Sequence, residues 1–406
     1  MTRLMTLALD GRRQEWEPLA RGMRDALLAD ARAGSAYWAG AAPEGTPFEE
    51  IPPLTKAIMH DRWDDLRMAG VPDELCAPGV TSGSSGEPGR FVIDTRAYGA
   101  HLAGLNALHL MCAVPLDVTT SYMTVSQVPE TRLAGAAYFS CLDMSPPALS
   151  RIVAGWAALE RYVLSVSSGA MPALLDALDA LGEPGPDPGP LAVIASRDMM
   201  TPDLRRRVAE TFGCPVHLWY GSREICGFLA GSVATDSASY AFNPLLVHVE
   251  VVDDDDRPLP PGEPGRLLLT DLHNRALPMI RYDTGDLGRM AGWSRGAWPV
   301  LEALEGRTSE VMYRADGSQM TLSDLGHHLF GVGDQSRWIS AFQFLQRRDG
   351  TIEMHVVWRE DPPAAAVERM AADLRPALGE GTPLRIVPVA ALGTLPSGKR
   401  WVVRRE

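Results

Sequence analysis

The sequence is poor in cysteine, and its cysteines follow no regular pattern. Five are scattered along 406 residues without a C-x-x-C pair, namely Cys76, Cys112, Cys141, Cys214 and Cys226. An odd, scattered set argues against a disulfide framework and against a zinc site built on cysteine. We therefore expect reduced thiols in a cytoplasmic protein.

Long hydrophobic runs and an excess of positive charge are missing as well. The apolar residues 4–9 are cut off by Asp10, which leaves a run too short for the core of a signal peptide. No segment approaches the length needed to span a membrane. Because 38 Lys and Arg stand against 51 Asp and Glu, the net charge is −13, which disfavours broad nucleic-acid binding. We expect partners that are neither nucleic acid nor membrane.

The order of apolar runs predicts a mixed α/β (α+β) fold of layered sheets and helices. Residues 191–195 and 216–220 read as buried strands, and a helix between them begins at Thr201-Pro202 and ends at Gly213. This strand–helix–strand order favours a parallel sheet. Residues 246–252 and 266–270 flank an acidic turn and predict an antiparallel hairpin.

Three further segments are predicted to be helical. Periodicity predicts a helix at residues 15–33. Residues 97–113 are apolar and rich in Ala and Leu, which favours a buried helix, and residues 148–181 read as two helices. His101 and His109 fall in the second segment, where we expect them to be core histidines rather than metal ligands. Residues 46–80 are rich in proline and read as short helices and turns, before a short strand at residues 91–93.

The pattern of predicted secondary structure changes after residue 306. A hairpin about Asp349-Gly350 joins residues 338–346 to residues 351–358, and a helix at 363–378 and a strand at 384–389 follow. About a hundred residues suffice for a small domain. We therefore expect a large domain over residues 1–305 and a small C-terminal domain over residues 306–406.

Residues 81–90, TSGSSGEPGR, are the leading candidate for an anion-binding loop. Their glycines, serines and threonine offer backbone N–H groups and hydroxyls to a phosphate, and glycine permits close approach. The stretch departs from the common P-loop because Glu87 stands where a lysine would follow the glycine. Taken alone, the stretch favours a flexible polar loop over a phosphate site.

Four other stretches occur in a fixed order after this loop: YGSRE at 220–224, RYDTGD at 281–286, Gly306-Arg307, and LPSGKR at 395–400. Together with the loop they resemble the adenylate-forming superfamily of acyl-CoA synthetases, adenylation domains and luciferases. The IPPLTK stretch at 51–56 is similar to the phenylacetate-CoA ligase-like branch. The resemblance covers residues 45–400 and implies a large domain followed by a small mobile α+β domain.

The resemblance also implies a reaction. A small carboxylic acid attacks the α-phosphorus of ATP, pyrophosphate leaves, and the acyl group passes to CoA. Two anions must meet, so such a site needs cations and N–H donors more than a base. By resemblance the loop residues Thr81, Ser82, Gly83, Ser84, Ser85 and Gly86 wrap the phosphates, and Glu224 binds Mg²⁺.

The remaining site residues are assigned by the same resemblance. Asp286 accepts hydrogen bonds from the ribose hydroxyls, and Arg307 reaches the ribose near the hinge between domains. Lys399 bridges the attacking carboxylate and the α-phosphate, and so acts with Glu224 and Arg307 in catalysis. Tyr220, Gly221 and Ser222 lie against the nucleotide. The plain structural alternatives are a core tyrosine, a turn aspartate and solvated basic residues.

The sequence departs from the family pattern around the nucleotide. Glu87 inverts a charge beside the triphosphate, and Arg223 replaces the usual Thr or Ser before the metal-binding glutamate. Residues 196–199, SRDM, stand where the family commonly has Gly-Gly-Glu-Pro, and Ser309 and Glu310 replace hinge aspartates. The charged residues of the predicted site are nevertheless all present, which favours an active, divergent enzyme.

Two other functions remain open. The acyl acceptor could be an amine, the thiol of a carrier protein or another small nucleophile in place of CoA. Alternatively, the protein could bind nucleotide or acyl groups without catalysis. The acid pocket is expected near Tyr138, Phe139, Tyr220 and Ser196, and its aromatic content suggests an aryl or medium-sized apolar acid.

Overall fold

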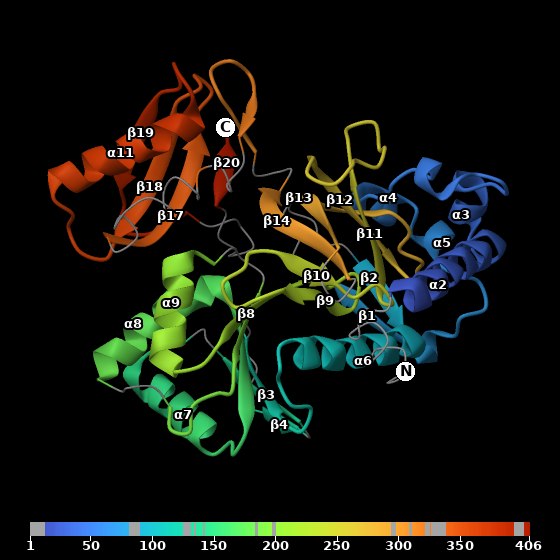
Figure 1. Cartoon of the computed structure of the whole chain (residues 1–406), viewed down its shortest axis with the longest axis horizontal. Coiled ribbons are helices and arrows are strands. Elements are labelled where there is room, and N and C mark those ends of the chain that lie inside the picture. The colour runs from blue at the N-terminus through green and yellow to red at the C-terminus, as the bar shows by residue number, and fades with distance from the viewer. Residues whose placement is uncertain are drawn as a thin grey trace.

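The structure is a computed structural model (Figure 1). It describes residues 13–80, 90–124, 131–133, 135–140, 143–182, 186–196, 200–293, 298–307, 311–320, 325, 338–393 and 402–406. Residues 81–89 and 394–401 lie outside this set, so the predicted phosphate loop from Thr81 to Gly86 and the predicted catalytic Lys399 have no structural account. No helix among the described residues is long and apolar enough to cross a membrane.

A twelve-stranded sheet forms the centre of the fold, in the order β11-β12-β13-β14-β10-β9-β8-β7-β6-β3-β5-β4. Five neighbouring strands pair in parallel: β5 (Ala136–Ser140), β3 (Thr119–Thr124), β6 (Tyr162–Ser167), β7 (Val193–Ser196) and β8 (Val216–Ser222). The other pairings in the sheet are antiparallel. The predicted mixed α/β fold is therefore confirmed.

The remaining strands of the sheet pair only antiparallel with their neighbours. These strands are β4 (Thr131–Leu133), β9 (Gly227–Ser232), β10 (Tyr240–Phe242), β11 (Val247–Val252), β12 (Pro264–Asp271), β13 (Tyr282–Trp293) and β14 (Pro299–Arg307). The predicted hairpin of residues 246–252 and 266–270 is β11 paired with β12. Register shifts interrupt the β13–β14 ladder at three places, and such bulges bend strands.

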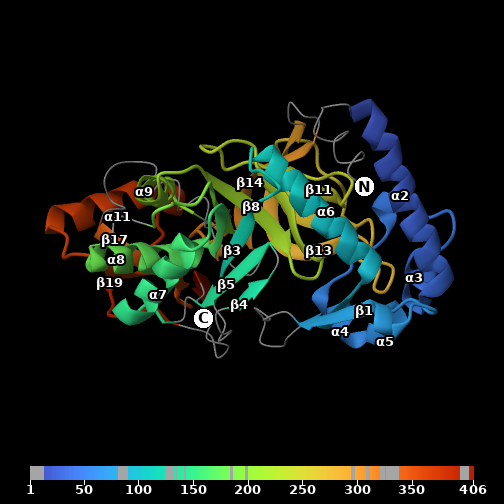
Figure 2. The same cartoon turned by 90° about the horizontal axis from the view of Figure 1, so that it is seen from below.

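Helices cover both faces of the parallel strands because alternate residues of a strand point to opposite faces. On one face α7 (Pro146–Ala157), α8 (Met171–Leu181) and α9 (Pro202–Phe212) form a core cluster with strand residues such as Leu164, Val193 and Leu218. On the other face α6 (Thr95–Met111) packs against their neighbours Val163 and Trp219. Figure 2 shows α6 lying across the sheet.

The N-terminal region packs around the antiparallel strands. It consists of α2 (Arg13–Gly34), α3 (Ala36–Ala41), η1 (Phe48–Glu50), α4 (Lys56–Asp61), α5 (Trp63–Leu66), η2 (Asp73–Leu75), β1 (Cys76–Val80) and β2 (Arg90–Asp94). The prediction of turns and helices up to residue 80 missed β1, which pairs antiparallel with β2. The last pair of this ladder is Val80 with Arg90.

The C-terminal residues form a second sheet in the order β19-β18-β17-β20. Its elements are β17 (Ile339–Gln346), β18 (Ile352–Trp358), α11 (Ala364–Leu378), β19 (Leu384–Pro388) and β20 (Val403–Arg405), after the short strands β15 (Met312–Tyr313) and β16 (Gln319–Met320). A separate core cluster holds them together, with buried residues between Met312 and Val403 only. The predicted hairpin, helix and strand are all present.

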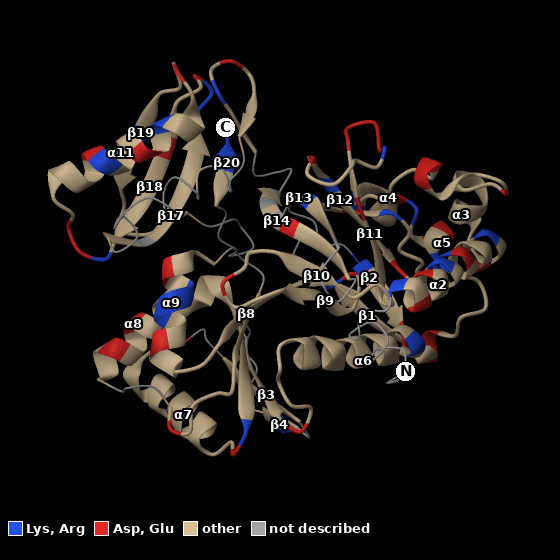
Figure 3. Ribbon diagram, viewed as in Figure 1, with Lys and Arg blue, Asp and Glu red and all other residues tan. Residues whose placement is uncertain are grey.

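Two other expectations meet different outcomes. The segment 148–181 holds two helices as predicted, but the strand β6 separates them. His101 and His109 are core histidines, with 4% and 5% of their surface exposed. Figure 3 shows basic and acidic residues interspersed along the ribbons of α2 and α9 rather than gathered by sign.

Candidate functional site

Glu224 lies in the turn between β8 and β9, and both of its carboxylate oxygens accept hydrogen bonds. The Ser222 hydroxyl donates to Oε2 at 2.8 Å, and the Tyr282 hydroxyl donates to Oε1 at 3.0 Å. Glu224 is 9% exposed and Tyr282 is 1% exposed. Because an ionised carboxylate has several acceptor positions, both oxygens keep capacity for a cation.

A lysine lies beside this carboxylate. Nζ of Lys56 is 3.8 Å from Oε1 of Glu224. Lys56 is the first residue of α4, whose start is capped by Thr55 accepting a hydrogen bond from the Ile58 N–H at 3.3 Å. The side chain stays partly open to solvent. In the sequence Lys56 stands out only as part of the IPPLTK stretch, which predicts no role for its side chain.

A signal for Lys56 was nevertheless present in the composition. Of 38 basic residues only two are lysine, Lys56 and Lys399, and all others are arginine. A chain that uses arginine everywhere else retains lysine at the predicted catalytic position and beside Glu224. Lysine provides a compact point charge that the planar guanidinium does not replace.

Tyr220 and Asp286 form the second polar contact of the site. The Tyr220 hydroxyl donates to Oδ2 of Asp286 at 2.7 Å. Asp286 is oriented from its own strand, where its N–H donates to Thr284 Oγ1 at 3.0 Å and Thr284 donates to the Leu267 carbonyl at 2.9 Å. The Tyr220 ring packs against Phe242 and is 8% exposed. Its predicted contact with the nucleotide stays a prediction.

Two tyrosine–carboxylate hydrogen bonds thus link the YGSRE and RYDTGD motifs. Tyr220 of the first motif holds Asp286 of the second, and Tyr282 of the second holds Glu224 of the first. Three strands, β14, β10 and β9, lie between β13 and β8 in the sheet order. In a flat sheet β13 and β8 would be about 19 Å apart, at about 4.8 Å per strand. Direct contact between their side chains therefore requires a strongly bent sheet.

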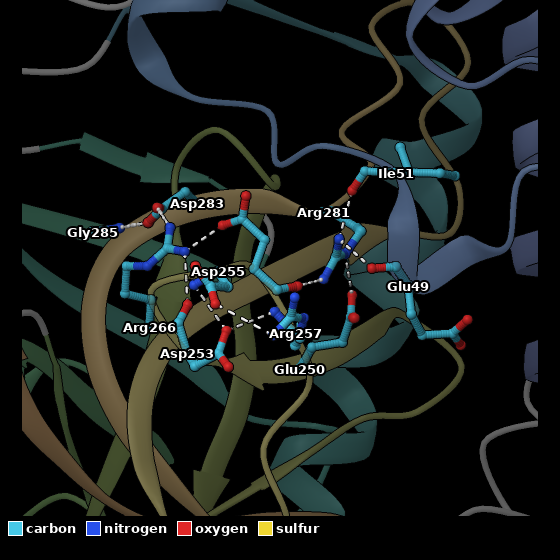
Figure 4. Close-up of polar contacts among 11 residues, drawn as sticks. Glu49, Ile51, Glu250, Asp253, Asp255, Arg257, Arg266, Arg281, Asp283 and Gly285 are labelled. Carbon is cyan, nitrogen blue, oxygen red and sulfur yellow. Dashed lines mark hydrogen bonds and ion pairs between the residues drawn. The ribbon is translucent and has the colours of Figure 1, made fainter.

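Arg281, the first residue of RYDTGD, is a structural anchor (Figure 4). It is 0% exposed with a φ of +47°, and its guanidinium donates to Glu250 Oε2 at 3.3 Å. It also donates to the carbonyls of Glu49 at 2.9 Å and Asp256 at 2.7 Å. These bonds tie the segment before the IPPLTK stretch to the start of β13. Arg281 therefore positions the motif and does not face the site.

Asp283 and Gly221 have structural roles as well. Arg266 Nη1 is 2.8 Å from Asp283 Oδ2, and Arg266 also pairs with Asp256 (Figure 4). A Cβ atom at Gly221 would lie 2.3 Å from the Gly227 carbonyl oxygen. The close approach of β8 and β9 therefore requires glycine at 221, whatever else the residue does.

Burial shifts the pKa values of two groups that take part in these contacts. It raises the pKa of Tyr282 well above its usual range, and the neighbouring Glu224 carboxylate adds to that shift. Tyr282 therefore remains a protonated donor. Burial likewise raises the pKa of Glu250, although the Arg281 guanidinium opposes the shift.

Arg307 follows Asp286 into the same region of the sheet. The two residues are paired across the β13–β14 ladder, at the last residue of β14. The structure thus places the main chain of Arg307 beside Asp286. The predicted phosphate loop and Lys399 lie outside the described residues, so their relation to Glu224 stays a prediction.

The expected acid pocket is partly wrong. Phe139 is 2% exposed and packs against Trp156 in the core under α7, which makes it a core residue. Adjacent Tyr138 points to the other face of the strand and stacks on Tyr122, with ring centroids 5.1 Å apart. Alternation along β5 explains why only one of two neighbouring aromatic residues could face a pocket.

The site can hold a divalent cation only together with oxygens from elsewhere. No group of three or more His, Cys, Asp or Glu side chains suited to a metal occurs within the described ranges. Glu224 supplies one hard carboxylate with remaining acceptor capacity. Mg²⁺ typically takes one or two protein carboxylates and completes its shell with phosphate and water oxygens. The donor set therefore fits Mg²⁺ bound with a nucleotide.

Comparison with known proteins agrees with this geometry. The model of a family described as AMP-binding enzyme matches residues 31–273. Phenylacetate-coenzyme A ligase of Pseudomonas putida is 28% identical over 147 residues, which cover 34% of this chain and 33% of that protein. The Escherichia coli (strain K12) protein of the same name is 29% identical over 117 residues, covering 28% and 26%. These alignments thus span a third or less of the relatives' length.

The fold also matches a solved structure over nearly its whole length. The structure of 2-hydroxyisobutyryl-CoA ligase in the postadenylation state superposes with a TM-score of 0.77 and 17% identity. The match covers 97% of this chain and 90% of that one. At this identity the likeness establishes the fold.

Proposed function

Because this chain belongs to the AMP-binding enzyme family, as its motifs predict, we propose that it is an ATP-dependent, AMP-forming carboxylate ligase. It adenylates a small carboxylic acid, releases pyrophosphate and passes the acyl group to CoA. The observation that most supports this proposal is the pair of reciprocal hydrogen bonds between the YGSRE and RYDTGD motifs. The tyrosine of each motif binds the predicted site carboxylate of the other, Asp286 or Glu224. The similarity to phenylacetate-coenzyme A ligases supports CoA as acceptor.

The charge of each site residue suggests which part of the substrates it binds. Asp286, fixed by Tyr220, accepts hydrogen bonds from the ribose hydroxyls, and Arg307 on the paired strand adds a cation beside it. Glu224 holds Mg²⁺, which when bound neutralises charge on the phosphates. The backbone and hydroxyls of the loop from Thr81 to Gly86 wrap those phosphates. Lys399 joins the carboxylate of the acid to the α-phosphate.

Lys56 can replace the cation that the phosphate loop lacks. Glu87 places a negative charge in the phosphate loop where the family has lysine. Lys56, 3.8 Å from Glu224, supplies a cation to the same phosphates from α4. Arg223, exposed at the neighbouring position of the β8–β9 turn, can supply another.

The C-terminal residues fit the proposed two-domain mechanism. Their buried cluster draws on residues from Met312 to Val403, which supports an independent unit over residues 306–406. We propose that this unit delivers Lys399 for adenylation and then rotates about residues 307–310 to admit the thiol. We also retain the proposed cytoplasmic location, which suits the free thiols of Cys76, Cys112, Cys214 and Cys226.

The test is pyrophosphate release from ATP and Mg²⁺ with a panel of aryl and aliphatic acids, with and without CoA. Acid-dependent release supports adenylation, and stimulation by CoA identifies the acceptor. Indifference to CoA with turnover supported by an amine or a carrier protein would select the alternative acceptor. No release with any acid, from folded protein that still binds ATP, would overturn the proposal in favour of a non-catalytic binding protein.

Matched variants connect the result to the site. Glu224→Gln and Asp286→Asn should reduce pyrophosphate release by at least about a hundredfold, the scale of losing one stabilising group for transition-state charge. Glu353→Gln is the control, because Glu353 is buried to a similar degree, 8% exposed against 9%, but lies in the C-terminal sheet. Equal activity of all three variants would contradict the assignment of Glu224 and Asp286.

A further inference from the structure

We propose that Tyr282 and Ser222 are positioning residues, which hold the Glu224 carboxylate in the orientation that binds a divalent cation. This inference rests on the proposed function, since that function assigns Mg²⁺ to Glu224. The two hydroxyls reach opposite oxygens of one carboxylate, Oε1 at 3.0 Å and Oε2 at 2.8 Å. Each oxygen then keeps an acceptor position for the cation.

The two donors lie on strands, whereas Glu224 lies on a turn. Ser222 ends β8 and pairs with Gly227 across the β8–β9 ladder. Tyr282 begins β13, where it pairs with Leu269 of β12 and forms a bridge with Leu54. The main chain of Tyr282 is therefore held on both sides, and a rigid ring carries its hydroxyl to Glu224.

The residue before Tyr282 reinforces this placement. Arg281 holds a φ of +47° and donates to three backbone carbonyls, at Glu49, Ile51 and Asp256. Rotation of Tyr282 about its backbone would break that set of bonds.

A purely structural role makes a different prediction. If Tyr282 only filled the core, replacing it with phenylalanine would change stability and leave cation binding unaltered. If Tyr282 positions Glu224, the same change removes a hydrogen bond, lets the Glu224 carboxylate rotate, and weakens cation binding. Partners that orient a metal ligand typically contribute tenfold to a hundredfold in affinity.

The experiment measures Mn²⁺ binding by electron paramagnetic resonance with saturating α,β-methylene ATP, which cannot release pyrophosphate. No acid is added, so the readout is binding and not turnover. Tyr282→Phe should weaken Mn²⁺ binding about tenfold, and Ser222→Ala should weaken it in the same direction. In Glu224→Gln, where the carboxylate is gone, adding Tyr282→Phe should cause no further loss.

Tyr162→Phe is the matched control. Tyr162 is also 1% exposed, and its hydroxyl donates to the Pro188 carbonyl at 3.4 Å within a core cluster on α7–α9. It loses the same atom at the same burial, away from Glu224. Its Mn²⁺ affinity should equal that of the unaltered protein.

The outcomes separate this inference from the proposed function. Unchanged Mn²⁺ affinity in Tyr282→Phe and Ser222→Ala overturns the positioning roles, while acid-dependent pyrophosphate release still supports the ligase. Absence of nucleotide-dependent Mn²⁺ binding in the unaltered protein overturns both. If Tyr282→Phe does not fold, Ser222→Ala decides, because the inference requires that variant to bind Mn²⁺ more weakly.

Discussion

The hydroxyl of Tyr220 lies 2.7 Å from Oδ2 of Asp286, although three strands separate their own strands in the sheet order. The contact joins the end of the parallel strands to the bulged start of β13. It depends on the bend of the sheet, and it places an aromatic ring and a carboxylate at one edge of the site. The phenol therefore restricts how Asp286 can point toward a ribose.

Tyr220→Phe should weaken ATP binding about tenfold, because a hydrogen bond to a charged group contributes about 1.5–3 kcal/mol. Calorimetric titration with ATP measures the effect. Tyr240→Phe is the control, since Tyr240 lies in the same aromatic group, with its ring 6.3 Å from that of Tyr220. Equal ATP affinity in Tyr220→Phe and the unaltered protein would show that Asp286 needs no such support.

Much of the architecture follows from local sequence. Thr201 caps α9 through a hydrogen bond from the Leu204 N–H at 3.2 Å, and Gly213 ends that helix at a φ of +62°. Such caps and turns act over a few residues, so sequence alone predicts them. The hairpin about Gly350, with a φ of +83°, is predictable for the same reason.

The features that the sequence does not predict depend on residues that lie far apart in the chain. Residues 162–167 form a strand because β3 and β7 flank them, although two helices adjoin them in sequence. Glu224 and Asp286 were predicted as site residues through their motifs. Tyr220 was predicted beside the nucleotide as well, but neither its bond to Asp286 nor the bond of Tyr282 to Glu224 was predicted. Both bonds depend on the bend of a twelve-stranded sheet. No pattern along the chain encodes that bend.

Arg281→Met should destabilise the protein by about 3–5 kcal/mol, because it leaves the buried Glu250 without its partner. Arg281 and Glu250 are 0% and 8% exposed, and Glu250 Oε1 already lacks a hydrogen bond. Urea unfolding measures the loss. The control is Arg206→Met, which removes an exposed pair with Glu210 on α9 and should change stability far less, because water screens an exposed pair. A similar small effect at Arg281 would refute its role as an anchor.

Lys56→Met should lower affinity for ATP about tenfold and leave affinity for AMP unchanged, because its ammonium is proposed to face the β- and γ-phosphates. Lys56→Arg should restore only part of the loss, since the guanidinium is larger and planar. Competition binding with ATP and AMP measures both affinities. Arg62→Met removes an exposed cation next to the other end of α4 and should alter neither. Parallel loss of ATP and AMP affinity in Lys56→Met would contradict a phosphate contact.

His109 should make the protein less stable as the pH falls below about 6.5. Burial lowers the pKa of His109 to about 4, and its Nε2 has no hydrogen-bond partner. Between those values the unfolded chain binds a proton that the folded chain excludes, so the free energy of unfolding rises with pH across this window. At about 1.4 kcal/mol per pKa unit, the contribution is at most roughly 3.5 kcal/mol.

The measurement is urea unfolding at pH 4.5, 5.5 and 6.5, followed by tryptophan fluorescence. Trp219 lies beside His109, with ring centroids 5.2 Å apart, so the probe reports on the site of titration. His109→Phe should reduce the dependence on pH, because an aromatic ring is kept and the proton-binding nitrogen is removed. Burial also lowers the pKa values of His217, His248 and His273, so part of the slope should remain. The exposed His60 supplies the control variant His60→Gln, which should keep the full slope. If His109→Phe keeps the slope too, other groups cause the loss of stability in acid.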